Sequence, residues 1–296
     1  MKQLLILSGK GGTGKTTVAS AFIKLADAKV YADCDVDAPN LHLVTKWHAE
    51  PQKKDYYGLP KAKIDAQLCT ECDQCRQKCR FDAISRKDKY KVDPFACEGC
   101  GVCEYICSQK AITMIPSAAG KLMLYSDKEK VFSTAQLNMG SGTSGRLVAE
   151  VKKQMRLAAV DARLAIIDGS PGIGCPVIAS LSGVDMVLLV TEPSISGISD
   201  MERIIDTAVN FGTKMAVCVN KYDIHRGNTE KIEEFCKKKD LPFVGRIPFD
   251  PDAVKAVNNG QTVVDVDCAA AIAVKDIYHQ TINLMFNKEV AKNNAY

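Results

Sequence analysis

The sequence predicts an α/β fold: a doubly wound, mainly parallel sheet that a small cysteine-rich α+β domain interrupts. Three observations carry this prediction. Apolar runs of strand length alternate with segments of helical periodicity over most of the 296 residues. A glycine-rich loop joins the first apolar run to the first helical segment. Eight of the 13 cysteines lie between residues 69 and 107, where this alternation stops.

The composition is that of an ordinary globular protein, and the length suggests about two domains. The sequence is 46% apolar and 25% charged, and its net charge of +4 is too small to predict binding to nucleic acid or to an anionic membrane. It has no run of 18 or more apolar residues, and residues 284–292 are too weakly amphipathic to anchor alone. We expect a cytoplasmic protein without membrane insertion, in a reducing compartment where clustered cysteines bind metal.

The glycine-rich loop has the sequence GKGGTGKTT and separates a strand at residues 4–7 from a helix at 18–25. Its glycines let backbone N–H groups turn inward around a phosphate. Lys15 can reach the β and γ oxygens, and the Thr16 hydroxyl can bind Mg²⁺. The loop therefore predicts nucleotide binding. The predicted binding residues are Gly9, Lys10, Gly11, Gly12, Thr13, Gly14, Lys15, Thr16 and Thr17.

The position of Lys10, directly after the first glycine, resembles the deviant Walker A loop of the MinD, ParA and nitrogenase-iron-protein class of ATPases. The resemblance implies ATP as the nucleotide and a dimer, either of identical chains or with a related ATPase. It also implies that Lys10 crosses the dimer interface and stabilises charge on the partner's nucleotide. Lys10 and Lys15 are thus catalytic candidates.

The next strand ends in the acidic segment DCDVDAPN at residues 33–40, which resembles switch I of the same class. The resemblance implies that Asp35 positions the attacking water beside Mg²⁺ and that Asn40 contacts the partner's nucleotide. Asp33 and Asp37 are expected to support Mg²⁺ or the dimer interface, and capping of a helix is an equal alternative for Asp37.

Residues 45–66 lack clear periodicity and are expected to form a linker or a small hairpin. A repeat of 28 residues follows, in which the spacing C-x2-C-x2-C-x3-C occurs twice. The predicted division is an ATPase part at 1–60, an inserted domain at 61–116 and a second ATPase part at 117–296.

This cysteine spacing resembles that of two-cluster bacterial ferredoxins, in which the fourth cysteine of each run binds the other cluster. The resemblance implies two [4Fe-4S] clusters, although tetrahedral zinc is a competing interpretation. Arg80 and Ser108 replace the proline that usually follows the fourth cysteine. The expected ligand sets are Cys69, Cys72, Cys75 and Cys107 for the first cluster and Cys97, Cys100, Cys103 and Cys79 for the second.

Two further features distinguish the copies of the repeat. Gly101 fits a tight turn around a cluster better than its counterpart Asp73, so we expect the first cluster to be the more labile. The first copy is locally basic, which favours an acidic redox partner, with a merely solvated surface as an equal alternative. Its basic residues are Arg76, Lys78, Arg80, Arg86, Lys87 and Lys89.

Residues 114–133 predict a hairpin or two returning strands, and residues 138–145 a mobile loop of small residues. After a predicted helix at 147–160, an apolar strand ends in Asp168, the Walker B position that holds Mg²⁺. The following DGSPG sequence resembles switch II, which implies that Gly172 lies near the γ-phosphate. Cys175 is expected to be a small buried residue at a helix start, with a cluster bridging the dimer as the alternative.

The C-terminal part continues the strand and helix alternation, with predicted strands at 184–190 and 215–219. The second of these strands ends in NKYD, which resembles the base-reading corner of P-loop nucleotidases. The resemblance implies that Asn220 contacts adenine, whereas the same tetrapeptide in GTPases reads guanine through its aspartate, so GTP stays open at this corner. The other predicted segments are a helix at 197–210, a strand and loop over the base at 243–251, and helices at 252–259 and 269–288.

Two functions follow from these features. The first is an ATPase that couples ATP binding and hydrolysis in a dimer to electron transfer through two [4Fe-4S] clusters, with an unidentified redox partner protein. The second is a regulatory or scaffold ATPase, in metal-cluster assembly or cell division, whose clusters serve as structure or as a redox sensor.

Overall fold

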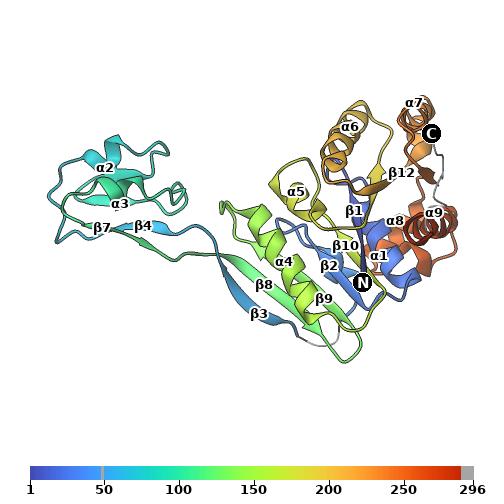
Figure 1. The fold of residues 1–296 in the computed structure, drawn as a ribbon, viewed down its shortest axis with the longest axis horizontal. Helices are drawn as coiled ribbons and strands as arrows, with labels where there is room; N and C mark the ends of the chain where they lie inside the picture. Colours follow the sequence, from blue (N-terminus) through green and yellow to red (C-terminus); the bar gives the residue numbers. More distant parts are fainter. Residues whose placement is uncertain (48–49, 288–296) are drawn as a thin grey trace, which may run out of the picture.

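The computed structural model of the chain, which describes residues 1–47 and 50–287, places a small lobe at the end of a strand pair that leaves a large sheet (Figure 1). The sheet and its helices contain the residues before and after the cysteine-rich segment. The small lobe contains the eight clustered cysteines. The residues before and after the lobe thus form one sheet, and the lobe is attached to that sheet.

The large sheet has nine strands among the described residues, in the order β13-β12-β11-β1-β10-β2-β9-β8-β3. The seven strands from β13 to β9 are parallel, while β8 and β3 are antiparallel to their neighbours. This confirms the predicted mainly parallel α/β sheet. The strands are β1 (Lys2–Leu7), β2 (Val30–Asp33), β3 (Gln52–Tyr57), β8 (Ala118–Ser126), β9 (Val131–Leu137), β10 (Leu164–Asp168), β11 (Met186–Thr191), β12 (Lys214–Asn220) and β13 (Phe243–Ile247).

Helices cover both faces of this sheet, because successive side chains of a buried strand point to opposite faces. Leu4 and Ile6 pack into the core beneath one helix layer, and Leu5 and Leu7 into the other. The first layer contains α1 (Lys15–Leu25), α8 (Pro251–Asn258) and α9 (Ala269–Phe286). The second contains α4 (Ser144–Ala158), α5 (Cys175–Leu181), α6 (Ile195–Val209) and α7 (Arg226–Lys238).

A buried lysine joins two helices of the second layer. Lys152 of α4 donates hydrogen bonds to the carbonyl oxygens of Ala179, Ser180 and Ser182 at the end of α5, at 3.3, 2.5 and 2.6 Å. These carbonyls have no partner within their own helix, so the ammonium caps it. The helix that follows switch II is thereby held against α4.

The described part of residues 45–66 is neither the predicted linker nor a small hairpin. It contains β3, which pairs with β8, and the first strand of the lobe, β4 (Lys61–Ile64), which pairs with β7 (Ile112–Ile115). Strand β3 forms the sheet edge, and Tyr56 is its one buried residue. Such an edge strand has no alternating apolar pattern, which explains why the sequence did not reveal it. The hairpin predicted within residues 114–133 is confirmed, because β8 and the start of β9 lie in this range and pair in antiparallel orientation.

The small lobe repeats one arrangement twice. Strand β4 pairs with β7 (Ile112–Ile115), and β5 (Ile84–Arg86) pairs with β6 (Tyr90–Val92); the two short helices are α2 (Gln74–Gln77) and α3 (Val102–Ile106). The Asp65 N–H donates to the Ala111 carbonyl at 2.7 Å, and the equivalent Asp93 N–H donates to the Ala83 carbonyl at 2.7 Å. Each copy therefore completes the other, as expected for an internal two-fold repeat.

The two copies share an unusual backbone conformation before each short helix. Asp73 has φ 63° and Gly101 has φ 75°, although only glycine adopts such angles without strain. The Asp73 carboxylate accepts hydrogen bonds from Arg76 Nε at 2.7 Å and from the Tyr90 hydroxyl at 2.6 Å. These bonds lower the pKa of Asp73. The side chain thus stabilises a turn that glycine makes in the other copy.

Helix α9 ends at Phe286, two residues before the predicted end, and residues 288–292 of the C-terminal segment lie outside the described residues. Within residues 1–47 and 50–287, every helix is too short or too polar to cross a membrane.

Candidate nucleotide site and cysteine cavities

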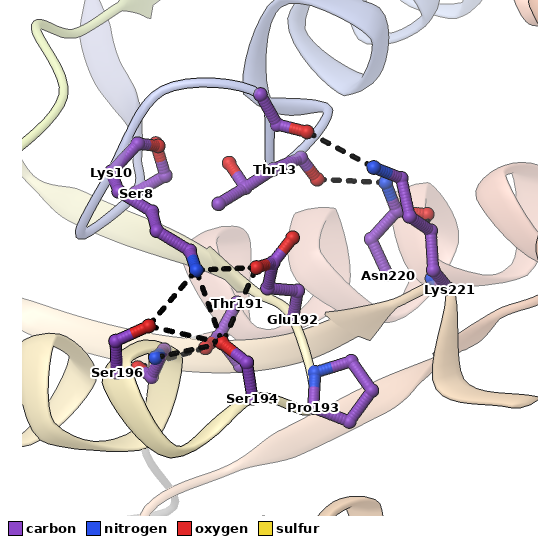
Figure 2. Close-up of polar contacts among 12 residues, drawn as sticks. Ser8, Lys10, Thr13, Thr191, Glu192, Pro193, Ser194, Ser196, Asn220 and Lys221 are labelled. Atoms are coloured by element: carbon purple, nitrogen blue, oxygen red, sulfur yellow. Dashed lines mark hydrogen bonds and ion pairs between the residues drawn. The ribbon is translucent and has the colours of Figure 1, made fainter. Parts of the chain in front are cut away.

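The phosphate loop lies between β1 and α1, and the end of β12 holds it in place. Gly14 has φ 90°, and a Cβ atom there would lie 2.2 Å from Asn220 Nδ2. Asn220 Nδ2 donates to the Thr13 carbonyl at 2.7 Å, and Lys221 Nζ donates to the Gly12 carbonyl at 3.1 Å (Figure 2). Glycine is therefore required at position 14, and the predicted base-reading residue also orders the loop.

Three residues predicted for phosphate and Mg²⁺ are in direct contact. Lys15 Nζ lies 2.6 Å from Asp168 Oδ1, and the Thr16 hydroxyl donates to Asp168 Oδ2 at 2.6 Å. Burial alone would lower the pKa of Lys15, but the ion pair with Asp168 outweighs burial and raises it. The loop thus carries a charged ammonium beside the carboxylate at the end of β10.

Asp33 organises the acidic segment instead of lying at an exposed interface. Its carboxylate is fully buried and accepts hydrogen bonds from the N–H groups of Asp35, Asn40 and Leu41 at 2.9, 3.0 and 3.0 Å. Burial and, next, the charge of Asp168 raise the pKa of Asp33 to about 7. Asp33 therefore does not lie at an exposed dimer interface, and the other expectation for it, support of Mg²⁺, stays a prediction.

The other polar residues of this segment are more accessible. Asp35 is half-buried, and its pKa is raised by burial and by the nearby Asp168, against the opposing effect of Lys15. Asp37 is exposed and begins no described helix, because Asn40 precedes the 3-10 helix Leu41–Leu43. The capping alternative for Asp37 is thus wrong. Asn40 is exposed, and it does not line the pocket beside the phosphate loop that is described next.

An apolar pocket opens beside the phosphate loop at the carboxyl ends of the parallel strands. Asn220 and Gly14 line it together with residues of the 243–251 segment that the sequence predicts over the base. The sequence did not predict the apolar lining that α8 and α9 contribute, because only one face of each helix lines the pocket. The principal apolar residues are Pro248, Phe249, Val254, Val257, Ala270 and Val274.

Switch II contacts both the phosphate loop and the acidic segment. The Gly172 N–H donates to the Ser8 carbonyl at 3.0 Å, and Gly172 has φ 95°. The Ser170 hydroxyl donates to the Cys34 carbonyl. Switch II is therefore bonded to both other segments, and its movement would break both contacts.

Lys10 is held within its own chain. Its Nζ lies 2.5 Å from Glu192 Oε1 and donates to the hydroxyls of Ser194 and Ser196 at 3.1 and 3.0 Å (Figure 2). Glu192 follows β11, 182 positions along the chain, so the sequence carried no sign of this contact. Whether Lys10 reaches a partner's nucleotide stays a prediction.

The lobe contains two small cavities that are each lined by four cysteines. Cys69, Cys72, Cys75 and Cys107 line the first cavity, and Cys79, Cys97, Cys100 and Cys103 line the second. Each cavity thus takes three cysteines from one copy of the repeat and the last cysteine of the other. In the part of the chain that the structure describes, no group of three or more His, Cys, Asp or Glu side chains is placed to hold a metal ion. Cluster binding therefore stays a prediction.

The remaining cysteines lie in the ATPase part. Cys175 is exposed at the first residue of α5, so its expected burial is wrong. Cys34, Cys218 and Cys236 are buried, and Cys268 is half-buried. Burial raises the pKa of Cys34 and of Cys218 to about 12, which keeps these thiols protonated.

Comparison with known proteins places this site in a family. The profile of the CobQ/CobB/MinD/ParA nucleotide binding domain matches residues 4–263. The chain is 31% identical to an uncharacterized protein of Methanocaldococcus jannaschii, over 94% of this chain and 95% of that protein. It is 25% identical to the iron-sulfur cluster carrier protein of Pyrococcus abyssi, over 95% and 85% of the two chains. The structure of the septum site-determining protein MinD of Pyrococcus horikoshii with Mg-ADP has a similar fold, with a TM-score of 0.57 and 19% identity over 96% of both chains.

The raised pKa of Asp33 predicts a specific pH dependence of stability. Between pH about 4 and about 7 the folded chain keeps the Asp33 proton, whereas the unfolded chain releases it. The free energy of unfolding of the wild type should therefore fall, relative to Asp33→Asn, as the pH rises through this range. Urea unfolding at several pH values without nucleotide measures this difference, and parallel stability curves for the two proteins would contradict it.

Proposed function

This chain belongs to the CobQ/CobB/MinD/ParA nucleotide-binding family, and on that premise we propose that it is a P-loop ATPase coupled to electron transfer through two [4Fe-4S] clusters. One observation carries the proposal. A single chain combines the contact of Lys15, Thr16 and Asp168 with a lobe that has two cavities lined by four cysteines each. The cysteine chemistry further suggests the cytoplasm as its compartment.

The residues of the phosphate loop suit ATP with Mg²⁺. Lys15 would bind the phosphate oxygens, while Thr16 and Asp168 would hold the metal. Burial, with a further contribution from the charge of Asp168, raises the pKa of Asp35, which suits a group that positions a water and accepts its proton.

Adenine is favoured over guanine at the base. Asp223, which would read guanine in a GTPase, accepts a hydrogen bond from the Phe249 N–H at 2.8 Å through Oδ1. One of its two carboxylate oxygens is thus used within the chain. The apolar lining of the pocket suits the flat face of adenine, with Asn220 at one edge.

The cavities of the lobe fit iron-sulfur clusters. Thiolate sulfur is the ligand that such clusters take from proteins, and the crossing of the fourth cysteine between the two copies matches the two-cluster spacing. The Ala111 N–H donates to Cys107 Sγ at 3.3 Å, a contact of the kind that tunes a cluster's potential. Each bound cluster would accept and release one electron.

Contacts within the chain offer a route between the two sites. The Leu137 N–H donates to the Val36 carbonyl of the acidic segment at 2.8 Å. The following residues approach the lobe, since a Cβ atom on Gly140 or on Gly142 would lie 3.7 Å from Phe95 or Glu98, respectively. Phe95 and Glu98 flank Cys97. A shift of the acidic segment can therefore reach the second cavity through residues 137–142.

We propose that the ATP-bound form is a dimer, with a second copy or with a related ATPase. Lys10 would exchange Glu192 of its own chain for the partner's nucleotide. The contact with Glu192 joins side chains that are 34% and 21% exposed, and exposed ion pairs contribute only about 0.2–1 kcal/mol. Nucleotide charge is thus strong enough to displace it.

A second candidate is a scaffold or carrier that passes its clusters on as cargo. Cys72 and Cys100, one in each cavity, are exposed, which would ease cluster release. The similarity to a protein named as an iron-sulfur cluster carrier supports the same alternative. Transfer of intact clusters to an apoprotein, faster than electron transfer, would favour this function.

The division of the eight cysteines between two cavities predicts how much iron is retained by variants with two substituted cysteines. Wild type purified without oxygen should hold about eight iron and eight sulfide per chain. Cys79→Ser with Cys97→Ser should keep about half, because both residues line the second cavity, whereas Cys79→Ser with Cys69→Ser should lose nearly all. Iron and sulfide assays with absorbance spectra test this. Zinc without visible absorbance, or the reverse order of the two double variants, would contradict the partition.

Lys15 and Asp35 should affect different steps of the ATPase cycle. Lys15→Ala should weaken ATP binding by about 100-fold or more, because it removes the buried cation beside the phosphates. Asp35→Asn should keep ATP affinity and slow hydrolysis by about 10²–10⁴-fold, since it removes only the group acting on water. Equilibrium binding and turnover assays distinguish the two. Wild-type turnover by Asp35→Asn would remove Asp35 from this role.

The contact between Lys10 and Glu192 should oppose dimerisation. With ATP and Mg²⁺ present, Glu192→Gln should raise the association constant of the dimer by up to about fivefold, because it weakens the ion pair between Lys10 and Glu192. Lys10→Ala should lower it, and Glu234→Gln on α7, which alters an exposed pair with Lys238, serves as the control. Sedimentation velocity measures the dimer fraction. Equal dimerisation of Glu192→Gln and the control would show that Glu192 does not restrain Lys10.

A further inference from the structure

The internal repeat gives the lobe two equivalent strand pairs, of which one is attached to the large sheet and the other is free. Strands β4 and β7 continue into β3 and β8, whereas the equivalent pair, β5 and β6, forms a hairpin at residues 84–92 (Figure 1). Residues of both pairs line each cavity, and the equivalent residues Ala62 and Tyr90 distinguish the two. Ala62, next to the start of the attached pair, lines the second cavity, whereas Tyr90 of the hairpin lines the first. The second cavity thus lies beside the arm, and the first lies beside the turn of the free hairpin.

A close backbone approach reinforces this asymmetry. Gly99, which lines the second cavity, has φ 69°, and a Cβ atom there would lie 2.3 Å from the Pro60 carbonyl oxygen. Its counterpart in the first copy is Glu71, whose side chain is 43% exposed. On this side the second cavity is therefore covered by the arm, whereas the equivalent side of the first cavity is open to an external protein.

Positive charge is denser in the first copy, which includes the free hairpin, than at the equivalent positions of the second copy. Residues 74–91 contain seven lysines and arginines against two aspartates, whereas the equivalent residues 102–119 contain one lysine and one glutamate. All seven basic side chains belong to exposed residues. The lobe thus does not need this charge in order to fold, because the second copy forms the same arrangement without it.

The acidic groups at the rim of the first cavity are already neutralised. Arg76 binds Asp73, and Arg86 binds Glu71 at 2.8 Å while its guanidinium lies 5.4 Å from the Tyr90 ring. Among the described residues, the other basic side chains have no ion-pair partner, and they leave a net positive surface. These are Lys78, Arg80, Lys87, Lys89 and Lys91.

We propose that the basic surface of the hairpin, formed by Arg86, Lys87, Lys89 and Lys91, is the docking site of an acidic redox protein that delivers electrons to the first cavity. Lys78 and Arg80 flank Cys79 of the second cavity and are not part of this surface. The inference rests on the proposed function and adds its partner and direction. One electron leaves the reduced partner and enters the cluster, and no atom is transferred. Unpaired lysines steer an acidic partner and orient it. Cys72, the exposed cysteine of this cavity, shortens the path of the electron.

The test compares two charge reversals in the full-length, cluster-loaded protein. The first variant carries Lys87→Glu, Lys89→Glu and Lys91→Glu, and the matched control carries Lys237→Glu, Lys238→Glu and Lys239→Glu at the end of α7. The probe is an acidic two-cluster bacterial ferredoxin. Its affinity is measured by titration at low and high salt, and its rate of electron delivery by stopped-flow absorbance.

We expect the hairpin variant to bind the ferredoxin at least tenfold more weakly and to lose most of the salt dependence. The control variant should resemble the wild type. Reduction of both variants by a small uncharged photoreductant should be unchanged, because docking does not enter that reaction. Iron and sulfide contents equal to those of the wild type show that the hairpin variant is folded and loaded.

Several results would overturn the docking site. Equal ferredoxin affinity of the hairpin variant and the control would contradict it. A charge reversal that shifts only the reduction potential would also contradict it, because the lysines would then only balance cluster charge. Tighter binding of a single-stranded DNA oligonucleotide than of ferredoxin would assign the surface to nucleic acid. A wild-type protein without iron and sulfide would instead refute the proposed function itself.

Discussion

The buried contact of Asp168 with Lys15 and Thr16 is the interaction on which the nucleotide-binding part depends. A buried carboxylate and a buried ammonium are each costly alone, so each requires the other. Asp168 lies at the end of β10, opposite Ile6 of β1 and Asp33 of β2. Because β10 is the strand between these two, its last residue lies between the phosphate loop and the acidic segment. Burial raises the pKa of Asp33, and the charge of Asp168, which holds the loop, raises it further.

Backbone contacts extend this arrangement outward. Switch II is bound to the phosphate loop through Gly172 and to the acidic segment through Ser170. The acidic segment is in turn bound to Leu137, at the start of the residues that approach the lobe. Two-state movements in proteins use such discrete contacts, since packed cores do not deform continuously. The lobe is thus attached where a change at the nucleotide can be transmitted to it.

The two copies of the repeat in the lobe have similar structures, but their surroundings and their charge differ. They share strand pairing, left-handed turns and cross-copy hydrogen bonds, so each cavity is built from both. Attachment to the arm, the close approach of Gly99 to Pro60, and the distribution of lysine then separate the cavities. The second cavity thereby lies beside the arm, and the first lies beside the free hairpin.

The sequence alone determined the features that depend on local spacing: the phosphate loop, the strand that ends in Asp168, the internal repeat and the mainly parallel α/β sheet. These follow from periodicity and from residue types at fixed intervals, which the chain carries wherever it folds. Only the tertiary structure decided the contacts between distant segments. It held Lys10 against Glu192, buried Asp33 under three backbone N–H groups, made β3 an edge strand and exposed Cys175. Such pairings depend on which strand ends the sheet order brings together, and no local pattern records that order.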